Sequence, residues 1–131
     1  MNSPSLKPTD AELEILQVLW RHGPSTVRFV NDQMSQQREI GYTTTLKLMQ
    51  IMAEKGLLYR DTRDKTHVYH AQVSQADTQQ QLLDRLLDSA FQGSAMNLVM
   101  QALGSHKTSP AELEEIRRFL DSLETPDTDT P

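Results

Sequence analysis

The sequence predicts a mainly α-helical protein in which three helices precede a short β-hairpin and further helices follow it. Two stretches, Thr9–Glu12 and Ser109–Glu112, have the form of a capping box, which marks the first turn of a helix. Between them, only residues 57–70 change from helical apolar spacing to short β-prone runs. Glycines stand where the predicted helices end.

The first helix is predicted to begin at Thr9. The Thr9 hydroxyl is placed to accept a hydrogen bond from the backbone N–H of Glu12, while the Glu12 side chain reaches back to Thr9. Gly23-Pro24 ends the helix, because glycine tolerates a left-handed backbone and proline cannot continue a helix. The wide apolar face of this helix consists of Leu13, Ile15, Leu16, Leu19 and Trp20.

The second and third helices follow after short turns. Ser25 or Thr26 is predicted to cap the second helix. The third runs from about Thr43 to Lys55, and Gly56 ends it in the left-handed conformation that glycine favours after a helix. The apolar spacing predicts inward positions at Val27, Val30 and Met34 in the second helix and at Thr45, Leu48, Met49 and Met52 in the third.

The next segment is predicted to form a hairpin with a charged tip. Two β-prone runs, Leu57–Arg60 and Thr66–His70, flank the polar residues Asp61–Lys65. Three helices followed by such a hairpin have the element order of a winged helix-turn-helix. In that fold the third helix enters the major groove of DNA and the hairpin, or wing, lies against the flanking backbone. The sequence therefore predicts a DNA-binding winged helix.

After residue 73 the apolar spacing is helical again. Ser74 and Ser94 are predicted to cap two helices, Gly93 ends the first of them, and Pro110 opens a third. A lone winged helix does not need these helices. Their apolar stripes therefore predict either a symmetric dimer that buries them or a fold-back onto the N-terminal domain. The residues predicted for dimerisation are Leu82, Leu83, Leu86, Leu87, Phe91, Leu98, Leu113, Ile116, Phe119 and Leu120.

This order predicts a winged-helix domain at residues 8–73 and a helical dimerisation domain at residues 74–123, with disordered ends at residues 1–7 and 124–131. The charge is divided in the same way. The formal net charge is −5, with nine basic and eight acidic residues in 1–73 against four and ten in 74–131. The acidic total alone would argue against a nucleic-acid partner, but the N-terminal half does not carry it.

Several function classes lack the residues that they require. The chain of 131 residues has no cysteine, which excludes disulfides and thiolate chemistry. His67 and His70 are three apart on a predicted strand, hence on opposite faces, and are poorly placed for one metal ion. No HExxH, P-loop, GxGxxG or GxSxG motif is present, so we expect no catalysis, metal or cofactor. The absence of a long apolar run or a signal-peptide pattern favours the cytoplasm.

The predicted third helix presents a polar outer face suited to reading DNA. Hydroxyl groups near its start can donate to phosphates or base edges, and longer side chains further along reach bases, lysine being suited to guanine and glutamine to adenine. Cations of the hairpin face the phosphate backbone. The candidate DNA-binding residues are Thr43, Thr44, Leu46, Lys47 and Gln50 of the helix and Arg60, Arg63 and Lys65 of the hairpin, with His67 as a further member.

Simpler interpretations stand beside these. A threonine-rich helix start is often only a cap, and a charged hairpin tip is often only a solvated turn, in which Asp61 and Asp64 would oppose phosphates. The acidic C-terminal half is also compatible with a winged-helix module that binds another protein and has no specific DNA target. Salt dependence distinguishes the two classes, because binding through phosphate contacts weakens steeply as salt rises.

Three stretches carry a resemblance to a known family. They are Pro8–Leu16 continuing to Leu19-Trp20, Tyr42–Leu46 followed by Lys55–Leu58, and Val68–Ala71 at the end of the hairpin. Together they resemble the penicillinase-repressor family (BlaI/MecI/CopY) over about residues 8–123. The resemblance implies a winged-helix DNA-binding domain, a helical dimerisation domain, and repression by a homodimer at inverted-repeat operators of the TACA/TGTA type.

The resemblance also implies a route of release. In antibiotic-responsive members a membrane-bound metalloprotease leads to cleavage in the C-terminal domain. The corresponding bond here is Gln101-Ala102, where those members have Asn-Phe. Copper-responsive members use C-terminal cysteines, which this sequence lacks. The implied partners are double-stranded operator DNA, a second copy of the chain, and a membrane-bound metalloprotease sensor.

Overall fold

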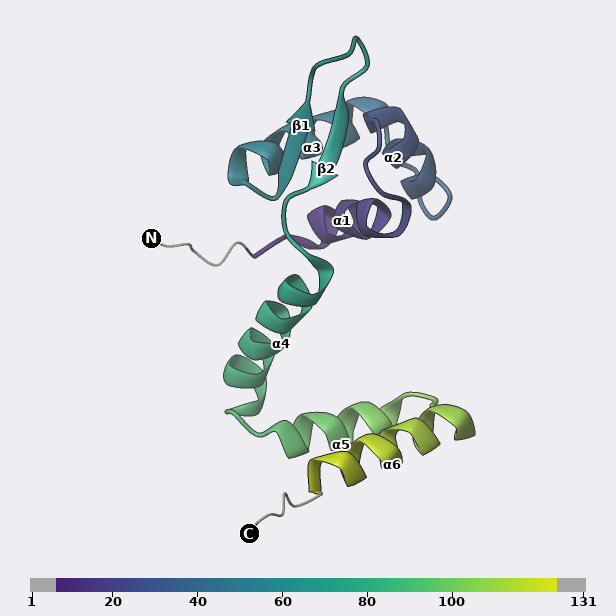
Figure 1. Cartoon of the computed structure of the whole chain (residues 1–131), viewed down its shortest axis with the longest axis vertical. Coiled ribbons are helices and arrows are strands. Elements are labelled where there is room, and N and C mark those ends of the chain that lie inside the picture. The colour runs from purple at the N-terminus through teal and green to yellow at the C-terminus, as the bar shows by residue number, and fades with distance from the viewer. Residues whose placement is uncertain (1–6, 125–131) are drawn as a thin grey trace. The chain divides into compact units, whose positions relative to one another are not determined.

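The computed structural model describes residues 7–124 and contains, within them, six α-helices and one two-stranded antiparallel sheet (Figure 1). The predicted disordered ends lie outside the described residues, except for Lys7 and for Glu124, the last residue of the sixth helix. This confirms the predicted fold class, mainly α with a β-hairpin. The elements are α1 (Asp10–His22), α2 (Val27–Met34), α3 (Tyr42–Lys55), β1 (Leu58–Asp61), β2 (Val68–Ala71), α4 (Gln75–Phe91), α5 (Ala95–Ser105) and α6 (Pro110–Glu124).

The helix ends follow the predicted capping residues. At the start of α1, Thr9 Oγ1 accepts from the backbone N–H of Glu12 at 3.2 Å, and Glu12 Oε1 accepts from the backbone N–H of Thr9 at 3.0 Å. Thr26, not Ser25, caps α2. Gly56 ends α3 with φ of 87°, in the left-handed region. The serines that accept a backbone N–H at the starts of α4, α5 and α6 are Ser74, Ser94 and Ser109.

The hairpin lies one residue further along the chain than predicted and is joined by a third segment. β1 pairs with β2 so that Arg60 lies opposite Tyr69 and Asp61 lies opposite Val68. Asp61 thus belongs to the strand, whereas the sequence placed it in the turn. The backbone of Ser25 exchanges two hydrogen bonds with that of Tyr69, of 3.0 and 2.8 Å, which ties the loop before α2 to the hairpin.

One hydrophobic core joins α1, α2, α3 and the hairpin. Figure 1 shows the two strands in front of α3, with α1 beneath them and the hairpin tip extending past the helices. The inward positions predicted for α2 and α3 are buried, except that Leu48 is half-buried at the core edge. The buried apolar residues are Ile15, Leu16, Leu19, Val27, Val30, Met34, Met49, Met52, Leu57, Leu58 and Tyr69, and the hydroxyl-bearing Thr45 is buried among them.

The chain divides into two compact units that meet between Arg85 and Leu86, inside α4. In the first unit, the indole Nε1 of Trp20 donates to the backbone oxygen of Val73 at 3.0 Å, which ties α1 to the segment leading into α4. Thr78, in the first turns of α4, is buried. The domain boundary predicted after residue 73 stays a prediction.

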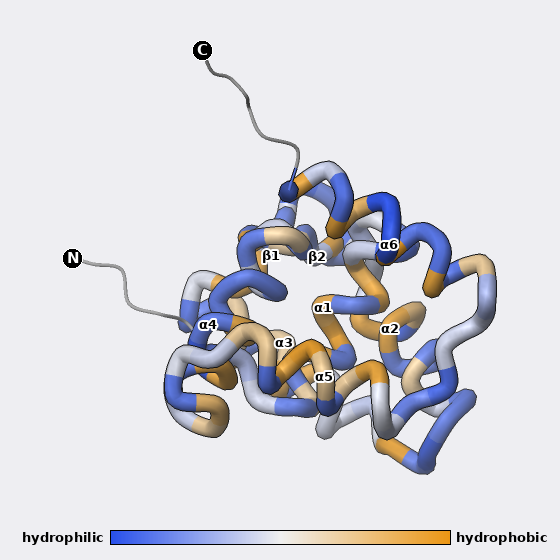
Figure 2. Tube along the Cα trace, turned by 90° about the horizontal axis from the view of Figure 1, so that it is seen from below, coloured by the Kyte–Doolittle hydropathy of each residue, from blue (hydrophilic) through white to orange (hydrophobic). Residues whose placement is uncertain are grey.

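The second unit has almost no interior of its own. None of its side chains is buried over residues 86–124, the part that the structure describes. Figure 2 shows hydrophobic positions, in orange, recurring along α5 and α6. No helix of the described chain is long and apolar enough to cross a membrane. The residues predicted for dimerisation are all exposed or half-buried: Leu82, Leu83, Leu86, Leu87, Phe91, Leu98, Leu113, Ile116, Phe119 and Leu120.

Candidate nucleic-acid interface

The threonines at the start of α3, Thr43 and Thr44, do not cap the helix. The N-cap is Gly41, and no side-chain hydrogen bond caps this end of the helix. α3 begins at Tyr42, one residue before the predicted start, so Thr43 and Thr44 lie in the first turn with exposed side chains. The interpretation that these threonines only cap the helix is therefore wrong.

Helix α2 fixes where α3 begins. With its amide nitrogen towards α3, the Asn31 side chain donates to Thr45 Oγ1 at 2.6 Å and to the backbone oxygens of Ile40 and Gly41 at 3.3 and 3.2 Å. Thr45 is fully buried, so this polar contact sits at the base of the exposed helix face. A buried hydroxyl with a partner orients the helix more strictly than apolar packing alone.

A cleft of about 770 Å³ lies between α2, α3 and the hairpin. Among its lining are four of the predicted DNA-binding residues, Leu46 and Gln50 from α3 and Arg60 and Lys65 from the hairpin, together with His67. Arg60 reaches this side because it lies opposite Tyr69 in the sheet, and cross-strand partners project from the same face. The fold thus brings residues from two distant stretches of sequence to one hollow.

The remaining helix candidates form a second exposed surface. Thr43 and Lys47 are four residues apart and therefore share a face of α3, one turn apart. Both are exposed and neither lines the cleft. Gln50 is exposed and also lines the cleft, so it joins the outward face of α3 to the hollow beside it.

Arg63 lies apart from the cleft-lining cations. Its guanidinium forms an ion pair with Asp61, with Nη2 2.7 Å from Oδ2 and Nε 3.0 Å from Oδ1. The hydrogen bonds from Arg63 lower the pKa of Asp61 to about 2. Asp61 is adjacent to Arg60 along β1, so the two side chains project from opposite faces of the hairpin. Arg63 thus has a carboxylate partner, which reduces the charge that it offers to a phosphate.

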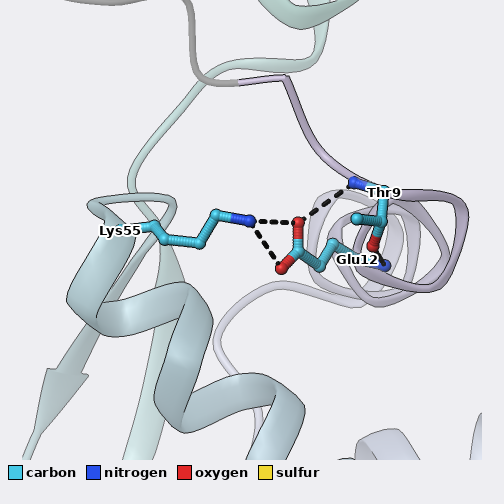
Figure 3. Close-up of polar contacts among 3 residues, drawn as sticks. All are labelled: Thr9, Glu12 and Lys55. Carbon is cyan, nitrogen blue, oxygen red and sulfur yellow. Dashed lines mark hydrogen bonds and ion pairs between the residues drawn. The ribbon is translucent and has the colours of Figure 1, made fainter.

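Lys55, another cation of α3, is engaged by a buried carboxylate. Its Nζ lies 2.9 and 2.8 Å from the two oxygens of Glu12, the same side chain that closes the capping box with Thr9 (Figure 3). Burial raises the pKa of Glu12, but the hydrogen bonds and charge of Lys55 and the bond from the Thr9 backbone outweigh it, so the net pKa is lowered. Lys55 therefore joins α3 to α1.

Sequence reasoning missed two residues of the cleft. Arg28, in the first turn of α2, places its guanidinium carbon 5.2 Å from the centre of the Tyr42 ring. Both residues line the cleft. Arg28 lies between the inward positions Val27 and Val30 as an exposed cation, and this placement on the helix before the predicted DNA-reading helix was the available signal.

Three packed helices, a two-stranded wing and an exposed polar third helix define a winged helix-turn-helix protein. The chain belongs to the penicillinase repressor family, whose family model matches residues 8–122. A transcriptional regulator BlaI of Mycobacterium tuberculosis is 30% identical over 118 residues, which cover 88% of this chain and 83% of that protein. The methicillin resistance regulatory protein MecI of Mammaliicoccus sciuri is 21% identical over 92% of this chain and 98% of its own.

A solved structure has the same fold. It is the solution structure of the DNA-binding domain of the repressor BlaI, with a TM-score of 0.50 and 22% identity, and the match covers 57% of this chain and 93% of that one. This likeness confirms the winged helix that the sequence predicts.

Proposed function

We propose that the chain is a transcriptional repressor that binds inverted-repeat operator DNA as a homodimer. The observation that carries this proposal is the exposed polar face of α3 beside a cleft with an excess of positive charge. The charged side chains that line the cleft are Arg28, Arg60 and Lys65 against one carboxylate, Asp32, with His67 beside them. The names of its relatives, a penicillinase repressor of Bacillus licheniformis among them, support the same function.

In this proposal α3 enters the major groove, which is about 12 Å wide and accommodates a helix. Lys47 and Gln50 reach base edges, and the hydroxyls of Thr43 and Thr44 contact the backbone or bases near the helix start. Arg60 and Lys65 replace counterions on the flanking strand. Occupation of a promoter by the protein then blocks transcription.

The second copy of the chain is the proposed partner of the second unit. A segment of 39 residues without a buried side chain cannot supply a stable core by itself. Two such segments related by a two-fold axis would bury each other's apolar stripes and would place two α3 helices for two half-sites.

Replacing Lys47 tests the reading of bases. We expect Lys47→Ala to weaken binding to the specific duplex by about 1–3 kcal/mol and to change non-specific binding much less. Lys65→Ala should weaken binding to all duplexes and lower the slope of log K against log salt by about 1 for each bound subunit. Fluorescence anisotropy over a salt series measures both effects. It needs a duplex with inverted TACA/TGTA half-sites, or one selected from a random library, and a scrambled duplex.

A matched control is Arg38→Ala. Arg38 is an exposed cation whose Nη2 lies 2.6 Å from Glu14 of α1, and it does not line the cleft, so we expect wild-type binding. If Lys47→Ala and Lys65→Ala bind like this control, the proposed contact surface is wrong. A wild-type chain that binds no duplex in a salt-dependent way would instead favour the protein-interaction module.

Release by proteolysis is a separate proposal. Gln101 and Ala102 are exposed and lie within α5. Because a protease binds its substrate in an extended conformation, this part of the helix must unfold before the bond between them is cleaved. The absence of buried side chains around it makes this local opening inexpensive in free energy. We expect a membrane-bound metalloprotease partner to yield fragments 1–101 and 102–131, identified by mass spectrometry. An intact chain, or cleavage at another bond, would contradict this proposal.

A further inference from the structure

Arg28 and Tyr42 form a cation–π pair among the residues that line the cleft. The guanidinium carbon of Arg28 lies 5.2 Å from the centre of the Tyr42 ring, which is 42% exposed. Within residues 7–124 no carboxylate forms an ion pair with Arg28. Asp32, one turn further along α2, also lines the cleft, but Arg28 contacts the ring. The cation is thus held in place without being neutralised.

The charges around Arg28 leave this rim of the cleft positive. Arg28 stands in the first turn of α2, where the helix dipole disfavours a cation, and that turn has no acidic residue. The first turn of α3, where Tyr42 begins the helix, has none either. By contrast, α1, α4 and α6 each carry an acidic residue in the first turn. The contact with the Tyr42 ring offsets part of this unfavourable placement, and an approaching anion would relieve the rest of the repulsion.

The placement of the guanidinium over the ring suits a phosphate. The ring attracts the cation without accepting hydrogen bonds in the plane of the guanidinium, so the N–H groups of Arg28 stay available for a bidentate contact. Phosphate oxygens match that edge better than a single acceptor does. Arg60 and Lys65 of the hairpin line the same cleft, so a DNA backbone strand over the hollow would meet cations from two separate parts of the chain.

We propose that Arg28, positioned by the ring of Tyr42, contacts a phosphate of the bound DNA from the α2 side of the cleft. The inference rests on the proposed function and adds a residue that the sequence did not indicate. It also assigns Tyr42 a positioning role: the ring holds the guanidinium, and the phenolic hydroxyl is dispensable.

The test is a salt series with the full chain on the inverted-repeat and scrambled duplexes. Arg28→Ala is expected to lower the slope of log K against log salt by about 1 for each bound subunit on both duplexes. Arg28→Lys should restore the slope but not the full affinity, because the planar fork is lost. Tyr42→Phe should match the wild type, whereas Tyr42→Leu should weaken binding with the slope unchanged. Asp32→Asn, on the same rim, should strengthen binding.

The two levels of the proposal fail in different ways. If the wild type binds with a steep salt dependence, Lys65→Ala reduces the slope, and Arg28→Ala matches the wild type, then this inference is wrong and the proposed function stands. If the wild type shows no salt-dependent binding, the proposed function is wrong and this inference with it. Arg38→Ala is the control for loss of a surface cation. Trp20, the single tryptophan of the chain, reports by its fluorescence whether each variant keeps its fold.

Discussion

Phe119→Asp is expected to convert the proposed dimer into a monomer. The Phe119 side chain is 61% exposed on α6, and Leu120 and Leu123 beside it are 51% and 65% exposed. Burying one such side chain contributes about 1.5–3 kcal/mol, and a two-fold interface contains it twice. The dissociation constant of the dimer should therefore rise by about 100-fold or more, which sedimentation velocity over a concentration series measures.

Loss of the dimer should also change how the chain distinguishes DNA duplexes. A dimer places two α3 helices on one inverted repeat, so the wild type should prefer two half-sites over one. Phe119→Asp should bind both duplexes alike, while Trp20 in the first unit keeps its native fluorescence.

Arg118→Asp is the matched control for this variant. Arg118 is exposed and precedes Phe119, and it lies on the polar side of α6, away from Ile116 and Leu120. We expect it to remain dimeric. A wild-type chain that is monomeric at tens of micromolar would contradict the homodimer and would leave the apolar face for a different protein.

The elements of the fold were predictable because their signals are local. The capping box at Thr9 needs only residues 9–12, and Gly56 needs only its own tolerance of positive φ. The hairpin is likewise indicated by local sequence, since β-prone runs stand on both sides of the charged tip. Even the inward positions of α3 follow from helical spacing, since Thr45, Met49 and Met52 lie within one face.

Contacts between side chains of different elements were not predictable from the sequence. They depend on how the helices and the hairpin pack against one another, which no single stretch of sequence shows. Lys55 counts as one more cation beside the DNA helix until the fold shows Glu12, 43 residues away, within hydrogen-bond distance. The contact of Arg63 with Asp61, two residues away, is local, but that Lys65 and not Arg63 lines the cleft depends on how the hairpin sits against α2 and α3. Arg28 was missed because nothing local relates it to Tyr42.

The contact between Glu12 and Lys55 leads to the largest expected effect on the stability of the first unit. The Glu12 side chain is 4% exposed and that of Lys55 is 37% exposed, so truncation of Glu12 leaves a cation that water reaches in part. Breaking a buried pair costs about 3–5 kcal/mol, and partial hydration of Lys55 reduces this. With the capping box also lost, Glu12→Ala should lower the free energy of unfolding by about 2–3 kcal/mol. Urea unfolding followed by Trp20 fluorescence measures it.

Glu12→Gln separates the charge from the cap, because an amide oxygen still accepts the backbone N–H of Thr9. We expect a loss of about 1–2 kcal/mol near neutral pH. Glu14→Gln is the control on the same helix: its partner Arg38 and Glu14 itself are 48% and 42% exposed, so the loss should stay below about 0.5 kcal/mol. Equal losses in the two variants would show that the Glu12 pair adds no more to stability than an exposed ion pair.

The dependence on pH provides an independent check. The pKa of Glu12 in the folded chain lies below its ordinary value of 4.5, so the unfolded chain takes up a proton first as pH falls. The stabilisation from this carboxylate is therefore complete above pH 4.5 and is lost as pH falls through the lowered pKa. The difference in unfolding free energy between wild type and Glu12→Gln should accordingly be constant near neutrality and shrink below pH 4.5. A difference that grows on acidification would contradict the lowered pKa. A carboxyl group gains in stabilising effect as pH falls only if folding raises its pKa.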